Sequence, residues 1–192
     1  MSSFIRFAGI TAVVLSLGLF ASALPVLNVK IAAVVGTDAI CLIFKKLLGD
    51  LALEAKINAL LDCVTIADLK VAVEALVAAL QICADDLLQI GAEVAVEADA
   101  KLSIIACVAS IITLLVQVLV RVCLKFGIAA TVTLCAQIDV VLRLCLVNLE
   151  ICIAGIVELI VKALAIVIVT LCAQVKLDLC VELFAKVAGV VA

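Results

Sequence analysis

The chain has 192 residues, of which 69% are apolar, whereas about 45–50% is usual in soluble domains. The formal net charge of -3 gives no electrostatic reason to expect nucleic-acid binding. The chain has no histidine, so neither a Ser-His-Asp nor a Cys-His catalytic arrangement can form. The sequence also contains neither a Cys-x-x-Cys metal motif nor a glycine-rich phosphate loop. We therefore expect no enzyme activity, no cofactor and no metal site.

The first 25 residues contain one basic residue, Arg6, followed by an apolar run that ends in Ala21-Ser22-Ala23. This order is typical of a secretory signal peptide with a small-residue cleavage site. We predict cleavage after Ala23, so that residues 1–23 are the signal peptide and residues 24–192 form one secreted domain. An uncleaved anchor helix is the alternative.

Cysteine is abundant, with ten residues that all lie beyond position 40. An even number in a secreted chain favours disulfide bonds, although spacing does not fix their pairing. The alternative is that they serve as small buried apolar side chains. The expected disulfide framework consists of Cys41, Cys63, Cys83, Cys107, Cys123, Cys135, Cys145, Cys152, Cys172 and Cys180.

In chain order, residues 24–37 contain the only proline and predict an extended lead-in. Residues 38–48 predict a short helix that ends at Gly49. Asp50 is placed to cap a second helix over residues 51–63. Both helices carry apolar residues at helical spacing.

A long amphipathic helix is predicted over residues 66–90. Thr65 and Asp68 form a capping-box pattern at its start, and Gly91 marks its end. Apolar residues at intervals of three and four predict its buried face. They are Leu69, Val73, Leu76, Leu80 and Cys83.

The next predicted helix covers about residues 99–126 and ends near Gly127. Residues 103–120 within it contain no charge, no glycine and no proline. A helix that is apolar on all sides must be buried in protein or in lipid. We expect it to supply an apolar surface for association, formed by Ile104, Leu114, Leu115 and Leu119.

The final third is also helical in pattern, with Gly155 as its one internal break signal before the tail. The sequence Thr-Leu-Cys-Ala-Gln occurs at residues 133–137 and again at 170–174, which indicates either a duplicated hairpin or chance. Strand signals are scarce throughout. The fold class predicted is therefore all-α: a single helical bundle of about six helices, linked by disulfides.

Charge is distributed unevenly between the halves. Residues 24–102 carry six lysines and eleven acids, so this half is the more polar and acidic one; the very apolar residues 103–192 carry six basic residues and five acids. In the second half the charges form narrow stripes with opposite signs at helical spacing. A membrane-spanning helix would place Glu158 and Lys162 in hydrocarbon, at about 2.5–3.5 kcal/mol each. The stripes are Asp139, Arg143 and Glu150; Glu158 and Lys162; and Asp178, Glu182 and Lys186.

This layout, with a signal peptide, a more polar front half and a very apolar rear half that contains cysteines, resembles the hydrophobic, cysteine-rich secreted proteins of fungal fruiting bodies that mediate hyphal adhesion. It differs from the hydrophobins, which have eight cysteines with two adjacent pairs in a β-rich core. The resemblance implies an extracellular role in matrix or cell wall.

The apolar helices have more surface than narrow polar stripes can cover, and exposed apolar patches mark association or membrane sites. The function we expect is structural: a secreted, surface-active protein that coats or adheres at the cell wall or another hydrophobic interface by self-association. Two alternatives stay open. One is a helical bundle that binds lipid or sterol, as saposin-like proteins do, and the other is a small integral membrane protein.

Overall fold

The computed structural model describes residues 29–92 and 94–189, so the predicted signal peptide of residues 1–23 lies outside the described residues. Within them the chain forms eight helices and no strand, which confirms the all-α prediction and corrects the expected number of about six. The helices are α2 (Ala39–Leu48), α3 (Leu53–Asp62), α4 (Ile66–Ile90), α5 (Ala98–Phe126), α6 (Ile128–Cys152), α7 (Ile156–Ala163), α8 (Ile166–Gln174) and α9 (Asp178–Val187).

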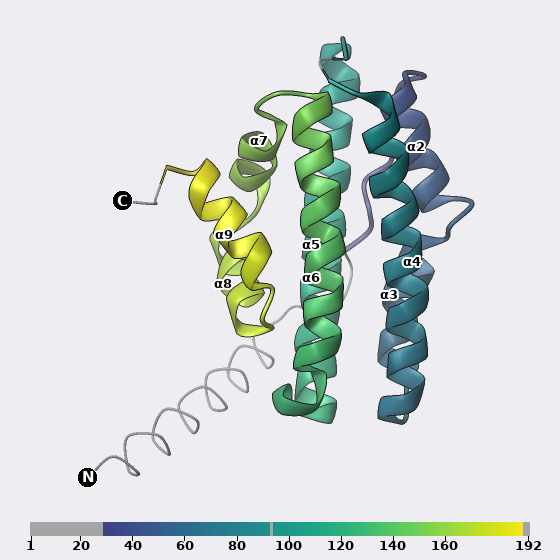
Figure 1. Ribbon diagram of the computed structural model, residues 1–192, viewed down its shortest axis with the longest axis vertical. Helices are drawn as coiled ribbons and strands as arrows, with labels where there is room; N and C mark the ends of the chain where they lie inside the picture. Colours follow the sequence, from purple (N-terminus) through teal and green to yellow (C-terminus); the bar gives the residue numbers. More distant parts are fainter. Residues whose placement is uncertain (1–28, 93, 190–192) are drawn as a thin grey trace.

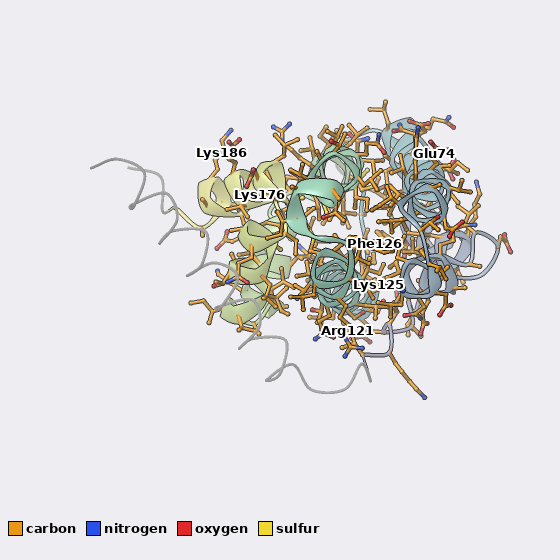
Figure 2. The ribbon with its side chains drawn as sticks, turned by 90° about the horizontal axis from the view of Figure 1, so that it is seen from below. Glu74, Arg121, Lys125, Phe126, Lys176 and Lys186 are labelled. Atoms are coloured by element: carbon orange, nitrogen blue, oxygen red, sulfur yellow. The ribbon has the colours of Figure 1, made fainter. Side chains whose placement is uncertain are left out.

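The helices lie in three layers (Figures 1 and 2). The long antiparallel helices α5 and α6 form the middle layer. On one side, α4 packs on α6, and α3 with α2 packs on α5 and α4. On the other side, the short helices α7, α8 and α9 cover α5 and α6. The middle layer is therefore enclosed by protein from two sides.

The front of the chain folds largely as predicted. Residues 29–37 form neither helix nor strand, and their backbone is held to α5 because the N–H of Ala32 donates to Ser110 Oγ at 2.9 Å. Asp38 caps α2 by accepting from the N–H of Cys41 at 3.0 Å. The predicted cap of α3 is wrong: Ala52, not Asp50, occupies the N-cap, with a left-handed φ of 47° and no side-chain cap.

The start of α4 confirms the predicted capping box. Asp68 N–H donates to Thr65 Oγ1 at 3.1 Å, and Thr65 N–H donates to Asp68 Oδ2 at 2.9 Å. These reciprocal bonds satisfy two N–H groups that a helix start otherwise leaves unpaired. The predicted inner face of α4 is fully buried, as it comprises Leu69, Val73, Leu76, Leu80 and Cys83.

The apolar composition of α5 fits its position in the middle of the bundle. It touches α2, α3, α6, α7 and α8, and 17 of its 29 residues are buried. Because partners surround it, a charge at almost any position between Ile104 and Val120 would be desolvated at high cost. This explains an apolar run of such length without any need for lipid around it.

The final third of the chain forms more and shorter helices than the sequence predicts. Breaks occur at Leu164–Ala165 and at Val175–Leu177, where neither glycine nor proline is present. At the second break Lys176 adopts a positive φ of 66°. The two Thr-Leu-Cys-Ala-Gln segments lie in different contexts, one inside the long α6 and one at the end of the short α8, so the structure contains no duplicated hairpin at these positions.

Candidate functional site

The residues expected to form an apolar association surface are inside the bundle instead. Ile104, Leu114, Leu115 and Leu119 are each at most 2% exposed. None of them is exposed in this structure, because α5 is covered by the layers on both sides, and association through them stays a prediction. The apolar surface of α5 becomes available only if a layer that contacts it moves away. One of the two layers around α5 is therefore the candidate functional element.

The cover layer, defined as α7, α8 and α9 with their connections, is built from short amphipathic segments. Each helix has eight to ten residues and lacks a side-chain N-cap of its own. Such short helices are marginal by themselves and depend on packing. Their inner residues are buried against the middle layer: Ile156, Val157 and Ile160 of α7, Ile168, Leu171 and Cys172 of α8, and Cys180 and Phe184 of α9.

A buried carboxylate of α6 holds the start of α9. Asp139, 2% exposed, accepts from the N–H of Leu179 at 2.7 Å and from the N–H of Cys180 at 3.0 Å. It therefore supplies, from another helix, the cap that α9 lacks, and its negative charge lies at the positive end of the α9 dipole. Burial and the neighbouring carboxylate raise the pKa of the Cys180 thiol, so this thiol stays protonated.

A second carboxylate of α6 holds the start of α7. Glu150 accepts from the N–H of Gly155 at 2.7 Å and from the N–H of Val157 at 2.9 Å. Within the described residues, the side-chain hydrogen bonds from the cover layer to α6 all end on Asp139 and Glu150. We call these two residues the latch carboxylates.

The charge stripes predicted for α6 and α9 meet in one groove. Its volume is about 550 Å³, and Arg143 and Glu150 of α6 face Glu182 and Lys186 of α9 along it. In Figure 2, Lys186 lies at the outer edge of the cover layer. The sequence placed these charges on separate helices, and the fold brings them together. The remaining lining is apolar: Val147, Ile151, Val157, Leu183 and Val187.

The junction between α7 and α8 presents apolar side chains to solvent. The two helices meet at an angle of 97°, and Ile166, the first residue of α8, is 86% exposed. Val167 beside it is also exposed. No residue of α8 carries a charge. This uncharged corner of the cover layer is suited to first contact with an apolar surface.

The ten cysteines are all buried and all free in the structure, so the predicted disulfide linkage is absent from it. Several act as interhelical donors instead. From α6, the thiols of Cys145 and Cys152 and the amide of Asn148 donate to backbone carbonyls of α4, at Leu80, Leu87 and Ala84 respectively, over 2.9–3.3 Å. Sequence analysis missed this set, although the 3–4 spacing of the three residues places them on one face of α6.

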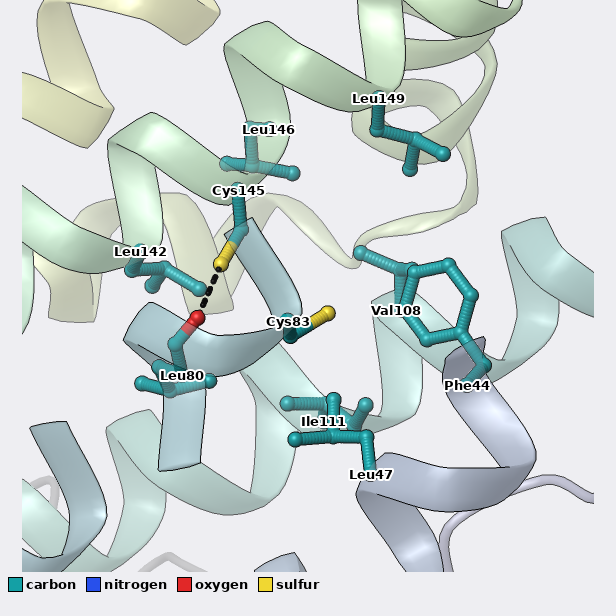
Figure 3. A pocket seen from close by; sticks show the side chains of 10 residues that line it. All are labelled: Phe44, Leu47, Leu80, Cys83, Val108, Ile111, Leu142, Cys145, Leu146 and Leu149. Atoms are coloured by element: carbon teal, nitrogen blue, oxygen red, sulfur yellow. Dashed lines mark hydrogen bonds between the residues drawn. The ribbon is translucent and has the colours of Figure 1, made fainter. Parts of the chain in front are cut away.

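Figure 3 shows one of these contacts. The Cys145 sulfur points to the Leu80 carbonyl beside a void of about 20 Å³, which is lined by Cys83 and otherwise by apolar side chains such as Phe44 and Val108. A void of this size could hold a water only if polar partners lined it. The thiols here therefore fill space between helices, as small apolar side chains do.

Burial keeps most of the thiols protonated. It raises the pKa of Cys107 and of Cys172 to about 12, and together with Asp38 it raises the pKa of Cys41 to about 12. Cys123 differs, because hydrogen bonds from Cys135 and Thr131 lower its pKa below the usual value of a thiol. Reactivity follows thiolate content, so Cys123 is chemically distinct from the other buried cysteines.

Within residues 29–92 and 94–189, two helices are long and apolar enough to cross a membrane, α5 with a mean hydropathy of 2.6 over its best 18 residues and α6 with 1.8. Of these windows, 78% and 50% respectively are buried inside the protein. Among the described residues, no three Cys, Asp or Glu side chains gather closely enough to hold a metal ion.

Comparison with known proteins finds no family model, no curated protein and no solved structure that matches this chain.

Proposed function

We propose that this protein is a secreted, surface-active structural protein that adsorbs to a hydrophobic interface by opening its cover layer. The observation that carries the proposal is the position of α5, whose apolar side chains are closed off on one side by two short helices, α7 and α8. Opening would expose the part of α5 that α7 and α8 contact. The same faces would then join neighbouring molecules, which gives self-association and a coat.

We expect the cover layer to detach from the middle layer more easily than the layer formed by α2, α3 and α4. Helices α2–α4 include the 25-residue α4, which α6 contacts along its length and to which it donates three side-chain hydrogen bonds. The cover layer has short helices and depends on Asp139 and Glu150 for its polar attachment. Burying apolar area contributes about 25 cal/mol per Å², so an apolar surface that replaces the cover layer can recover what opening loses.

Measurement of surface pressure at an air–water interface tests the proposal. We expect the protein to raise the surface pressure, and Asp139→Ala to do so several-fold faster because one latch carboxylate is lost. The matched control is Asp178→Asn, which neutralises an exposed carboxylate at the same end of α9. A wild-type protein that stays monomeric and leaves the surface pressure unchanged would refute the proposal.

Hydrogen exchange of protein adsorbed to apolar beads locates the movement. Opening of the cover layer predicts loss of amide protection in α7–α9 while α4 stays protected. Equal loss in all helices would indicate general unfolding at the surface and would contradict the mechanism. Fractionation of expressed protein between medium, wall and membrane tests secretion, since carbonate extraction releases a secreted protein and leaves an integral one in the membrane.

A second candidate function is the binding of a single lipid or sterol. The groove between α6 and α9 favours it, because its volume of about 550 Å³ lies in the range of small-molecule sites, about 300–1,000 Å³. Its apolar lining would hold a hydrocarbon body and Arg143 or Lys186 a polar head. Lipid that co-purifies with the wild type and is lost in Val147→Trp would support it.

A further inference from the structure

One pair of cysteines lies where α5 turns into α6. Cys123 is in the last turn of α5 and Cys135 is in the second turn of α6, with Gly127 between the helices. Both side chains are buried, at 4% and 1% exposed. Cys123 is two residues before Lys125, which Figure 2 labels together with Phe126.

Thr131 connects the two thiols. Its Oγ1 lies 3.3 Å from the Cys123 sulfur, and Cys135 follows one helical turn later on the same face of α6. Cys135 is thereby placed near enough to Cys123 for each thiol to shift the pKa of the other. The structure therefore brings two cysteines and one hydroxyl together across the α5–α6 hairpin, although the cysteines are twelve positions apart in the sequence.

The surroundings distinguish the two sulfurs. Hydrogen bonds from Cys135 and Thr131 favour the thiolate of Cys123, and the pKa of Cys135 is raised by its hydrogen bond to Cys123, by burial and by Asp139 on the next turn of α6. Thr131 also donates to the carbonyls of Gly127 and Ile128 at 3.0 and 3.2 Å. Since a hydroxyl has one proton, Thr131 can turn it from a carbonyl to the sulfur when Cys123 ionises.

We propose that Cys123 and Cys135 form a redox pair, in which a small-molecule disulfide oxidises the two thiols to a bond that clamps the α5–α6 hairpin. This inference is independent of the opening of the cover layer. It assigns a specific pairing where the sequence left all pairings open.

The reaction balances in two exchange steps. When the end of the hairpin opens enough to admit oxidised glutathione, the Cys123 thiolate attacks it, forms a mixed disulfide and expels one glutathione thiolate, which takes a proton from water. Cys135 then gives its proton to water and attacks the Cys123 sulfur, expelling the second glutathione. The protein loses two electrons and two protons, and one disulfide becomes two glutathione thiols.

A second thiol pair in the same molecule is an internal control. Cys83 and Cys145 line the same void, and the neighbouring Cys145 thiol together with burial raises the pKa of Cys83. This pair lies inside the contact between α4 and α6, next to the apolar void. Without a stabilised thiolate it should react more slowly than the pair at the hairpin.

The experiment uses the full, reduced protein incubated with oxidised glutathione at a series of pH values, followed by alkylation, digestion and mass spectrometry. We expect Cys123–Cys135 to be the first bridge formed, with a rate that rises with pH and does so at a lower pH than for an ordinary thiol. Cys135→Ala should stop the reaction at the mixed disulfide on Cys123. Cys83→Ala should leave the rate of the first bridge unchanged.

Thr131→Val keeps the shape of the buried side chain and both sulfurs, so it separates thiolate stabilisation from folding. We expect its pH–rate profile to move upward and its rate at neutral pH to fall at least about threefold, because a larger fraction of Cys123 is protonated. Formation of Cys83–Cys145 or any other bridge before Cys123–Cys135 would overturn the proposal. So would a Thr131→Val profile that coincides with that of the wild type.

Discussion

Replacing Asp139 with alanine should release the cover layer from the bundle at α9. The wild-type carboxylate is buried and accepts two N–H groups, from Leu179 at 2.7 Å and from Cys180 at 3.0 Å. Alanine removes both acceptors at once. The N–H of Cys180 is then left in a buried position without a partner.

The expected loss of stability follows from these contacts. A buried donor without a partner costs about 1–3 kcal/mol, and loss of a helix cap costs about 0.5–2 kcal/mol. The two effects describe partly the same bonds, so we expect a total of about 2–3 kcal/mol for Asp139→Ala. Asp139→Asn keeps one acceptor oxygen and should lose about half as much.

Two measurements check this prediction. Urea unfolding followed by circular dichroism gives the free energy of unfolding, and hydrogen exchange shows where protection is lost, which should be α9 first. Asp178→Asn is the control, expected within about 0.5 kcal/mol of wild type because Asp178 is exposed. If Asp139→Ala matched this control, or if α4 lost protection before α9, the latch assigned to Asp139 would be wrong.

Three further predictions concern other contacts. Glu150→Gln weakens the acceptor for Gly155 and Val157, so their amides should exchange faster, with about 0.5–1.5 kcal/mol lost; unchanged exchange at both amides would contradict this. Asn148→Ala leaves the Ala84 carbonyl without its 2.9 Å donor and should cost about 1–3 kcal/mol in urea unfolding, whereas replacing the exposed Asn58 of α3 with alanine should have little effect. The Thr65 hydrogen bonds lower the pKa of Asp68 below 3.8. The stability from this cap is therefore present above about pH 4 and is lost as the pH falls through the folded-state pKa of Asp68. A Thr65→Ala protein whose acid-unfolding curve has the same shape as that of the wild type would contradict this.

The sequence predicted the front of the molecule well because local signals there are complete. Asp38 and the Thr65–Asp68 capping box mark helix starts, and Gly91 and Gly127 mark helix ends. These signals depend on the backbone of a few neighbouring residues, so they can be recognised without knowledge of the fold. Asp50 failed as a cap because the turn before α3 places Ala52 in that position.

The rear could not be predicted to the same depth, because tertiary contacts decide its structure. The break before α8 has no glycine or proline, and the caps of α7 and α9 come from α6 at Glu150 and Asp139. The spacing of apolar residues such as Leu115 along the sequence is the same whether they pack against protein or against an external apolar surface. Only the position of α5 between two layers shows that it is buried.

Helix α6 is attached differently to its two neighbouring layers, and cysteine is the reason on one side. A thiol is small and weakly polar, so Cys145 and Cys152 let α6 approach α4 closely while still donating to its carbonyls. On the opposite face α6 carries Asp139 and Glu150, whose bonds end on short helices. The middle layer is thus fastened along the length of α4 on one side and at two helix starts on the other. This asymmetry is the reason that the cover layer, rather than α2–α4, should leave first when an apolar surface competes for α5.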